Sequence, residues 1–228
     1  SIAVSAGERA SIGVIARGET LETVNADAAQ MAEVCAERAA ALAADTLRWA
    51  GALLVMCLAW FRADTLAGGQ SRDIVFARDG SLVITVRRMK GRPDFKRQPG
   101  LVQIPGAADG HPRQIILNII RSLLHLEPRA FDRISDAIRR DSRPPSDVLT
   151  AKLRELVPRH MVNIPDGAII ASHSFREMGA SIGMAAGYSD NKSRRHGLWK
   201  RLATMLDHYL EDDFPYSRFL ARIFDFLR

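Results

Sequence analysis

The sequence predicts a mostly helical α+β domain with one small three-stranded antiparallel sheet. Three short β-branched runs occur in the middle of the chain, between residues 73 and 104. Apolar residues at helical spacing occupy both sides of that region. Helices, then one small sheet, then helices is the order of elements that an α+β domain shows.

The part before the sheet predicts a loose lead-in and two helices. Residues 1–24 have little periodicity and contain several glycines. Alanine interspersed with Glu and Arg favours helix over residues 26–44. Asp45 and Thr46 are residues that cap helices, and they precede an apolar run at helical spacing that reaches Phe61. We therefore expect a second helix to begin there.

The strands and the later helices follow from the same periodicities. Residues 73–76, 81–86 and 101–104 are the β-branched runs, and Asp79-Gly80 between the first two favours a hairpin turn. After Pro112 the helical period returns, punctuated by prolines and glycine. The predicted helices cover residues 112–125, 128–140, 146–157, 173–187, 193–210 and 215–227.

The composition indicates a globular protein with a polyanionic partner. Lys and Arg total 32 against 26 Asp and Glu, a formal net charge of +6. Cations placed on phosphates release condensed counterions, so a basic domain fits nucleic acid. The longest apolar run, residues 49–61, is shorter than a bilayer span, and no leader is seen at the start. We expect a soluble intracellular chain with no membrane partner, whose two cysteines are buried reduced thiols.

The common catalytic fingerprints are absent from the sequence. It has no phosphate-binding P-loop, no G-x-G-x-x-G after a strand, no H-E-x-x-H, no G-x-S-x-G and no Cys/His zinc spacing. What remains is a set of cations followed by a late tyrosine.

Two clusters carry these cations. His173 and Arg176 lie three residues apart, so at a helix start they share one face and can both point at an anion. The alternative is that His173 caps or packs and Arg176 is a surface cation. Downstream, the second cluster at residues 194–200 precedes a helix that carries Tyr209. A phenol attacks phosphorus when cations lower its pKa, although a tyrosine in that position is usually half-buried core.

In this order the residues resemble the tyrosine recombinase family, also called phage-integrase-type recombinases. That family has an Arg in a G-[LF]-R-type segment closing an apolar helix, a Lys on a β-hairpin, an H-x-x-R box, a His or Trp, and a nucleophilic Tyr. The matching residues here are Arg62, Lys90, His173, Arg176, Trp199 and Tyr209. Lys96 is an alternative to Lys90, and His196 is an alternative to Trp199.

The resemblance covers residues 45–228, with departures from the family pattern, among them a segment between Lys90 and the third strand, Gly91 to Gly100, that is longer than a tight turn. A Glu commonly follows the first Arg by three residues and orients it, whereas this chain has Thr65 there with Asp64 beside it. Residues 1–44 are too few for the helical core-binding domain of full recombinases. We expect them to be a remnant of, or linker from, such a domain, so that the chain is an isolated catalytic domain or its clamp lies on a missing segment.

The resemblance implies cleavage and rejoining of DNA through a 3′-phosphotyrosyl link formed by Tyr209. The two arginines would grip non-bridging oxygens, and Lys90 would protonate the leaving 5′-oxygen. His173 would assist proton transfer or hold the phosphate, and the Trp199 indole would donate a hydrogen bond. Neither a metal nor another cofactor is implied.

The implied partner is double-stranded DNA of a mobile element, with the protein in the cytoplasm or nucleoid, or in a eukaryotic nucleus. Further cations that would contact phosphates are Arg87, Arg88, Arg92, Lys96, Arg97, Arg194 and Arg195. An apolar stripe marks the last helix, at Phe219, Leu220, Ile223, Phe224 and Leu227. That helix would either dock into a neighbouring copy, building a tetramer on DNA, or pack on its own core.

Three alternative functions share part of this pattern. A type IB topoisomerase or a telomere resolvase uses the same Arg, Lys and Tyr chemistry, although topoisomerases usually have Lys in place of the His in the H-x-x-R box. A domesticated recombinase that only binds DNA is the third. If Tyr209 is not the nucleophile, Tyr216 or Tyr188 is the next candidate.

Overall fold

The computed structural model describes residues 21–89, 93–160, 171–209 and 218–228. The chain separates into two compact units, Ser1–Thr46 and Leu47–Arg228. This division lies two residues after the boundary that the sequence predicts. Of the first unit, only part of one helix is described, so the account below concerns the second.

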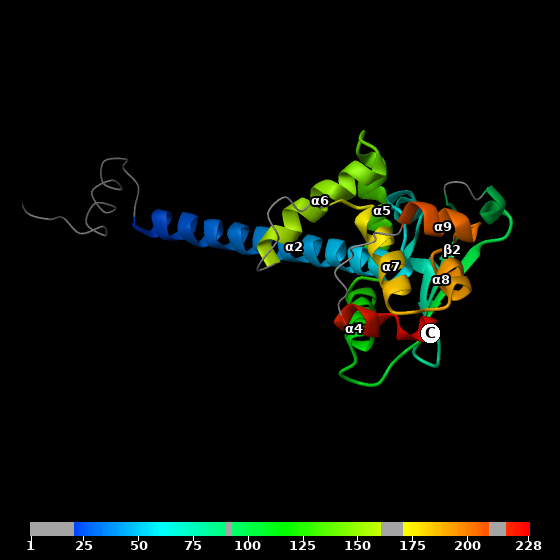
Figure 1. The fold of residues 1–228 in the computed structure, drawn as a ribbon. Helices are drawn as coiled ribbons and strands as arrows, with labels where there is room; N and C mark the ends of the chain where they lie inside the picture. The colour runs from blue at the N-terminus through cyan, green and yellow to red at the C-terminus, as the bar shows by residue number, and fades with distance from the viewer. Residues whose placement is uncertain (1–20, 90–92, 161–170, 210–217) are drawn as a thin grey trace, which may run out of the picture. The chain divides into compact units, whose positions relative to one another are not determined.

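Helix α2 (Leu21–Ala59) is one unbroken helix (Figure 1). The prediction of two helices, with the second beginning near Asp45 and Thr46, is wrong. Both residues favour caps, but they lie between Ala44 and Leu47 with no Gly or Pro beside them, so the helical hydrogen bonds continue through them.

By length and composition, the stretch Cys35–Ala59 of α2 is long and apolar enough to cross a membrane. The predicted apolar run was shorter because it left out the alanine-rich turns. Within an apolar window of 18 residues in this stretch, 39% of the residues are buried in the protein. The last turns of α2 supply Trp49, Val55 and Leu58 to the core of the second unit. Cys57 is partly buried as expected, whereas Cys35 is exposed.

The predicted antiparallel sheet is confirmed. It consists of β1 (Ile74–Phe76), β2 (Leu82–Val86) and β3 (Gly100–Ile104), in the order β1-β2-β3. Ile84 of the central strand pairs with Ile74 on one side and Val102 on the other. All three of these side chains are buried, so one face of the sheet is packed against the core.

The helices around the sheet make the domain mostly helical, as predicted. A short helix, α3, follows α2 directly. The described helices of this unit beyond α2 are α3 (Ala63–Ala67), α4 (Pro112–Leu126), α5 (Ala130–Arg140), α6 (Pro145–His160), α7 (Ser174–Ala185), α8 (Asp190–His196), α9 (Leu202–Tyr209) and α10 (Arg218–Ile223). Helix α3 packs against α5 and α6, and α7 packs against α8, α9 and α10.

One predicted helix, residues 193–210, is in fact two. Helix α8 ends at His196, and Leu198 adopts a positive φ of 57°. Arg194 stabilises the break, because its Nη1 donates to the carbonyl of Trp199 at 3.1 Å. Gly197 is required there, since a Cβ would come within 1.9 Å of the Trp199 ring. The break brings Trp199 into the interior instead of along a continuous helix surface.

The C-terminal segment packs on its own chain. It forms α10 and the short 3-10 turn Asp225–Leu227, and Ile223, Phe224 and Leu227 are buried. Arg113, at the start of α4, donates to the carbonyl of Ile223 at 3.0 Å and to Asp225 at 2.5 Å. Of the two arrangements expected for the apolar stripe, the structure shows the one in which the segment packs on the core of its own chain. The side chains of Phe219 and Leu220 lie outside the described residues.

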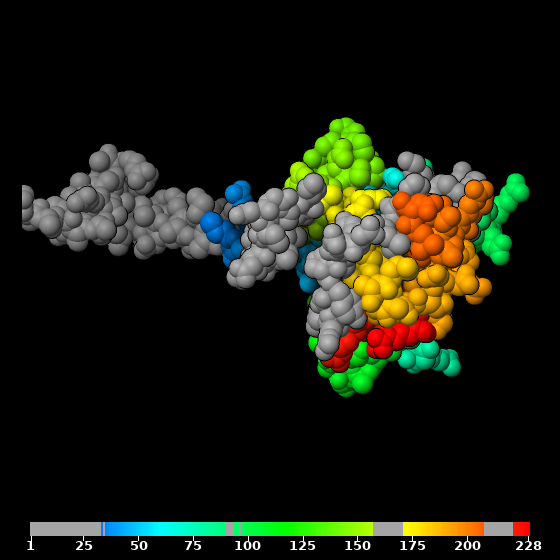
Figure 2. Space-filling model, viewed as in Figure 1, coloured from blue at the N-terminus to red at the C-terminus, as the bar shows by residue number. Residues whose placement is uncertain are grey.

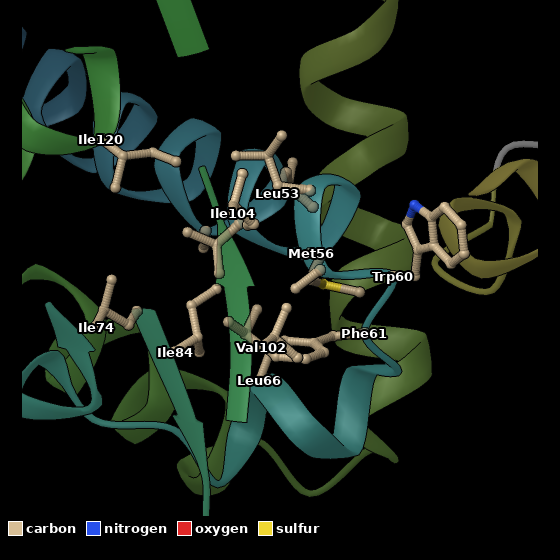
Figure 3. Packing of buried hydrophobic residues seen from close by; sticks show 14 of the residues in the cluster. Leu53, Met56, Trp60, Phe61, Leu66, Ile74, Ile84, Val102, Ile104 and Ile120 are labelled. Atoms are coloured by element: carbon tan, nitrogen blue, oxygen red, sulfur yellow. The ribbon is translucent and has the colours of Figure 1, made fainter. Parts of the chain in front are cut away.

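The core of the second unit lies between the end of α2 and the sheet. Met56 and Phe61 from the α2 end contact the inner face of the strands, near Val102 (Figure 3). Trp60 points away from this cluster (Figure 3). The end of α2 and Trp60 after it therefore pack against the sheet on one side and against α7 and its neighbours on the other.

Candidate active site

Arg176 lies on α7 and is the buried cation of the site. Its side chain is 1% exposed. Its Nη1 donates to the carbonyl of Trp60 at 2.8 Å, and its guanidinium carbon lies 4.0 Å from the centre of the Trp199 ring. A planar guanidinium stacked on an indole is held in one orientation. The interpretation of Arg176 as a plain surface cation is therefore wrong.

Arg62 follows Trp60 by two residues and stands as N-cap of α3. Helix α2 ends at Ala59, so Arg62 closes it within three residues, where the sequence predicts. Thr65, at the position where the resembling family has Glu, is buried, and its N–H donates to the Arg62 carbonyl at 3.0 Å. The Thr65 backbone thus helps to hold the turn that carries Arg62.

His173 lies at the N-cap of α7, half exposed, with Glu177 one turn away. Partial burial lowers its pKa below the ordinary value, and the Glu177 carboxylate opposes that shift. The positive charges of Arg62 and Arg176 lower the pKa further. Three of the six predicted catalytic residues therefore lie close enough to interact, and His173 is held in its neutral form near pH 7.

Trp199 and His196 are the two alternatives for one position, and they lie differently. Trp199 is 4% exposed and stacks on Arg176. His196 is buried among aromatic rings, and its Nε2 donates to the Leu58 carbonyl at 2.6 Å. That bond assigns the proton to Nε2. Trp199 is the residue in contact with the arginine, and His196 belongs to the packing behind it.

The buried His196 predicts a loss of stability in acid. Burial lowers its pKa to about 4, against the opposing effect of the bond to Leu58. The unfolded chain takes up this proton near pH 6.5, so the stabilisation is complete above that pH and is lost as pH falls toward 4. We expect the unfolding free-energy difference between wild type and His196→Gln to shrink by about 2 kcal/mol between pH 7 and pH 4.5, measured by urea denaturation. An unchanged difference would contradict the assignment.

Lys90 and the side chain of Tyr209 lie outside the described residues, and so do Arg92 and the side chain of Lys96. The structure does describe residues next to Lys90 and the helix that ends at Tyr209. Met89, the neighbour of Lys90, is buried just beyond the end of β2. Tyr209 is the last residue of α9, which packs against the helix of Arg176. The surface over α9 (orange) lies beside that over α7 (yellow) in Figure 2.

The described surface cations differ in how they are engaged. Arg87 forms a 2.7 Å ion pair with buried Asp73, and Arg194 donates a hydrogen bond to the Trp199 carbonyl across the break after α8. Arg97 and Arg195 are exposed. Arg88 is also exposed and lines a cavity of about 650 Å³ with Asp64 and Arg139. A second cavity of about 450 Å³ is lined by Arg194 and Arg195 together with the loop before β3.

Two residues near these features were not singled out from the sequence. Trp60 supplies the carbonyl that receives Arg176, and a tryptophan directly after an apolar helix was the available signal. Arg139 faces the cavity with Arg88, and nothing in its helical pattern separates it from other surface arginines. Within the described residues, no group of three or more His, Cys, Asp or Glu side chains is placed to hold a metal ion.

Tyr188, one of the two alternative nucleophiles, is buried and bonded within the domain. Tyr188 is 5% exposed, and its hydroxyl donates to the carbonyl of Ala221 in the C-terminal segment. A buried phenol that is already bonded cannot reach a phosphodiester without unfolding this part of the domain. Tyr216 lies outside the described residues.

A scan against protein-family models finds no match for this chain, and a search of curated proteins finds none. The family resemblance therefore stays a prediction that depends on the residues and contacts described above.

Proposed function

We propose that this chain is the catalytic domain of a site-specific DNA recombinase or integrase that uses a tyrosine nucleophile. One observation carries the proposal. Arg62, His173 and Arg176, which come from segments more than a hundred residues apart in sequence, interact around the end of α2 and the start of α7, with Trp199 stacked on Arg176.

The chemistry of this group fits a phosphodiester. Two guanidinium groups and an imidazole supply hydrogen-bond donors to an anion, and a buried arginine stacked on a ring keeps its donors aimed. A neutral imidazole also accepts a proton, which suits His173 as an acid–base group. Tyr209 would attack phosphorus from the end of α9, and Lys90 would donate a proton to the leaving 5′-oxygen.

The DNA duplex would lie over the exposed cations beside this group. Arg88, Arg97 and Arg195 are exposed among the described residues. Contacts of this kind position a duplex without reading its sequence. Arg87 and Arg194 contribute less in this proposal, because each is already bonded within the protein.

Assembly on DNA through the C-terminal helix is part of the proposal, with one structural condition. Ile223, Phe224 and Leu227 are buried in their own domain. A tetramer built through this segment would need neighbouring copies to exchange it, so that the same contacts form between chains.

The competing functions differ in one product. A topoisomerase-like or resolvase-like enzyme also forms a phosphotyrosyl link, whereas a DNA-binding remnant forms none. The presence of His173 in the anion-binding group favours a recombinase over a topoisomerase.

A covalent-capture experiment tests the proposal. Nicked duplexes with a randomised central sequence are incubated with the protein, and DNA that stays attached after denaturation is recovered and amplified. A nick lets the short 5′-hydroxyl strand diffuse away, so the covalent product accumulates. We expect an adduct that is enriched for one sequence over successive rounds. DNA binding without any adduct would favour the non-catalytic alternative.

A further inference from the structure

Trp60 combines two features that rarely occur together. Its side chain is completely buried, and its backbone has a positive φ of 52°. Residues other than glycine seldom adopt this left-handed backbone conformation, because their Cβ approaches the following carbonyl. Where such a conformation persists, the surrounding structure must hold it.

The left-handed backbone at Trp60 sets the arginines of the site. It ends α2 and turns the chain into α3, so that Arg62 becomes the N-cap of α3. It also presents the Trp60 carbonyl to Arg176, whose Nη1 donates to it at 2.8 Å. The Trp60 carbonyl therefore holds Arg176 next to the turn that carries Arg62.

The indole of Trp60 is enclosed by aromatic rings from three parts of the chain. Its ring lies 4.8 Å from that of His196, 5.3 Å from Phe224 and 6.0 Å from Trp199, all edge to face. Gly179 of α7 closes the remaining side, since a Cβ there would come within 2.4 Å of the indole nitrogen. Edge-to-face pairs at these separations are favourable, and together they fix the ring.

We propose that Trp60 is a positioning residue for Arg176. The aromatic enclosure holds the Trp60 indole, the indole holds the left-handed backbone, and the carbonyl of that backbone holds the guanidinium over Trp199. The inference rests on the proposed function for its catalytic meaning. The positioning itself is a property of the protein without DNA.

Two substitutions disturb the enclosure from opposite sides. Trp60→Gly keeps the left-handed conformation accessible but removes the ring that fixes it. Gly179→Ala keeps Trp60 but places a methyl group where the indole lies, and alanine is a better helix former than glycine. Trp60→Phe keeps an aromatic ring. Trp49→Ala is the control, because it truncates an equally buried ring of α2 that contacts Lys152 instead of Arg176.

The test has one readout without DNA and one with it. The side-chain N–H signals of Arg176, assigned with Arg176→Lys, are followed by ¹⁵N NMR. We expect Trp60→Gly and Gly179→Ala to shift and broaden them, and Trp60→Phe and Trp49→Ala to leave them near the wild-type position. In single-turnover cleavage at saturating DNA, Trp60→Gly should slow adduct formation about 10- to 100-fold, the range for one hydrogen bond to a charged group. Trp60→Phe should stay within about 3-fold of the wild-type rate.

The two readouts separate the inference from the function. Arg176 signals that respond to Trp60→Gly no more than to Trp49→Ala would overturn the positioning role, whatever the cleavage assay gives. If Trp60→Gly does not fold, Gly179→Ala decides by the same comparison. Shifted signals in a protein whose wild type forms no adduct support the positioning role while the proposed function fails.

Discussion

Tyr209→Phe is expected to abolish the covalent protein–DNA adduct that the proposed function predicts for wild type on a nicked duplex. Phenylalanine has the same ring but no phenolic oxygen, so the bond to phosphorus cannot form. We expect the adduct yield to fall by at least about 10⁴-fold, which is the scale of losing an essential nucleophile. DNA binding should change little, because the proposed phosphate contacts come from other residues. The measurement is denaturing gel electrophoresis of end-labelled DNA, with binding followed separately by mobility shift.

The chain offers two matched controls, since it contains three tyrosines in all. Tyr188→Phe removes a hydroxyl that is bonded to the Ala221 carbonyl, so it should cost about 1 kcal/mol of stability and leave the adduct in place. Tyr216→Phe should also keep the adduct. An adduct that survives Tyr209→Phe but disappears in Tyr216→Phe would show that the assignment of the nucleophile is wrong.

Arg113→Met is expected to lower the free energy of unfolding by about 2–4 kcal/mol. Arg113 is buried, and it donates to the carbonyls of Pro105 and Ile223 and to the carboxylate of Asp225. Methionine keeps much of the apolar stem, but it loses the guanidinium that lies 5.0 Å from the centre of the Phe226 ring and leaves both carbonyls without this donor. Asp225 is 41% exposed, so water takes part of the lost interaction and the estimate stays below that for a fully buried pair. Urea denaturation measures the change.

A surface ion pair provides the control for this substitution. Arg143 bonds to Asp141 with its side chain 53% exposed, so Arg143→Ala should leave the unfolding free energy close to that of wild type. Trypsin should also cut Arg113→Met faster than wild type after Arg222, because the segment held by Arg113 includes that bond. Equal and small losses in both variants would show that the C-terminal segment does not depend on Arg113.

The predicted elements were confirmed where the local signal was strong and continuous. The three strands were found because β-branched residues repeat with a period of two between turn residues. The predictions failed where the surroundings of a residue override its own preference. Asp45 and Thr46 carry cap-forming side chains, yet the alanines around them keep α2 helical. Gly197 and Leu198 break the helix after His196, because Trp199 is drawn inward against Arg176.

For the candidate site, spacing predicted which residues lie near one another better than how each is held. Spacing alone placed His173 and Arg176 on one helix face, and the pair does lie at the start of α7. Spacing could not show that Arg176 is buried, since burial depends on Trp60 and Trp199 from distant segments. It also left His196 and Trp199 as alternatives. Only the partners of each ring, the Leu58 carbonyl for His196 and the guanidinium for Trp199, separate them.

By itself the sequence determined the fold class, the antiparallel sheet and the residue types able to meet a phosphate, because these depend on short-range periodicity and side-chain chemistry. Tertiary structure alone decided which cations are held in place. The left-handed backbone at Trp60 joins the two arginine segments only when rings from α8, the break after it and the C-terminal segment close around the indole. Such an enclosure depends on contacts between residues far apart in the chain, and no local pattern encodes it.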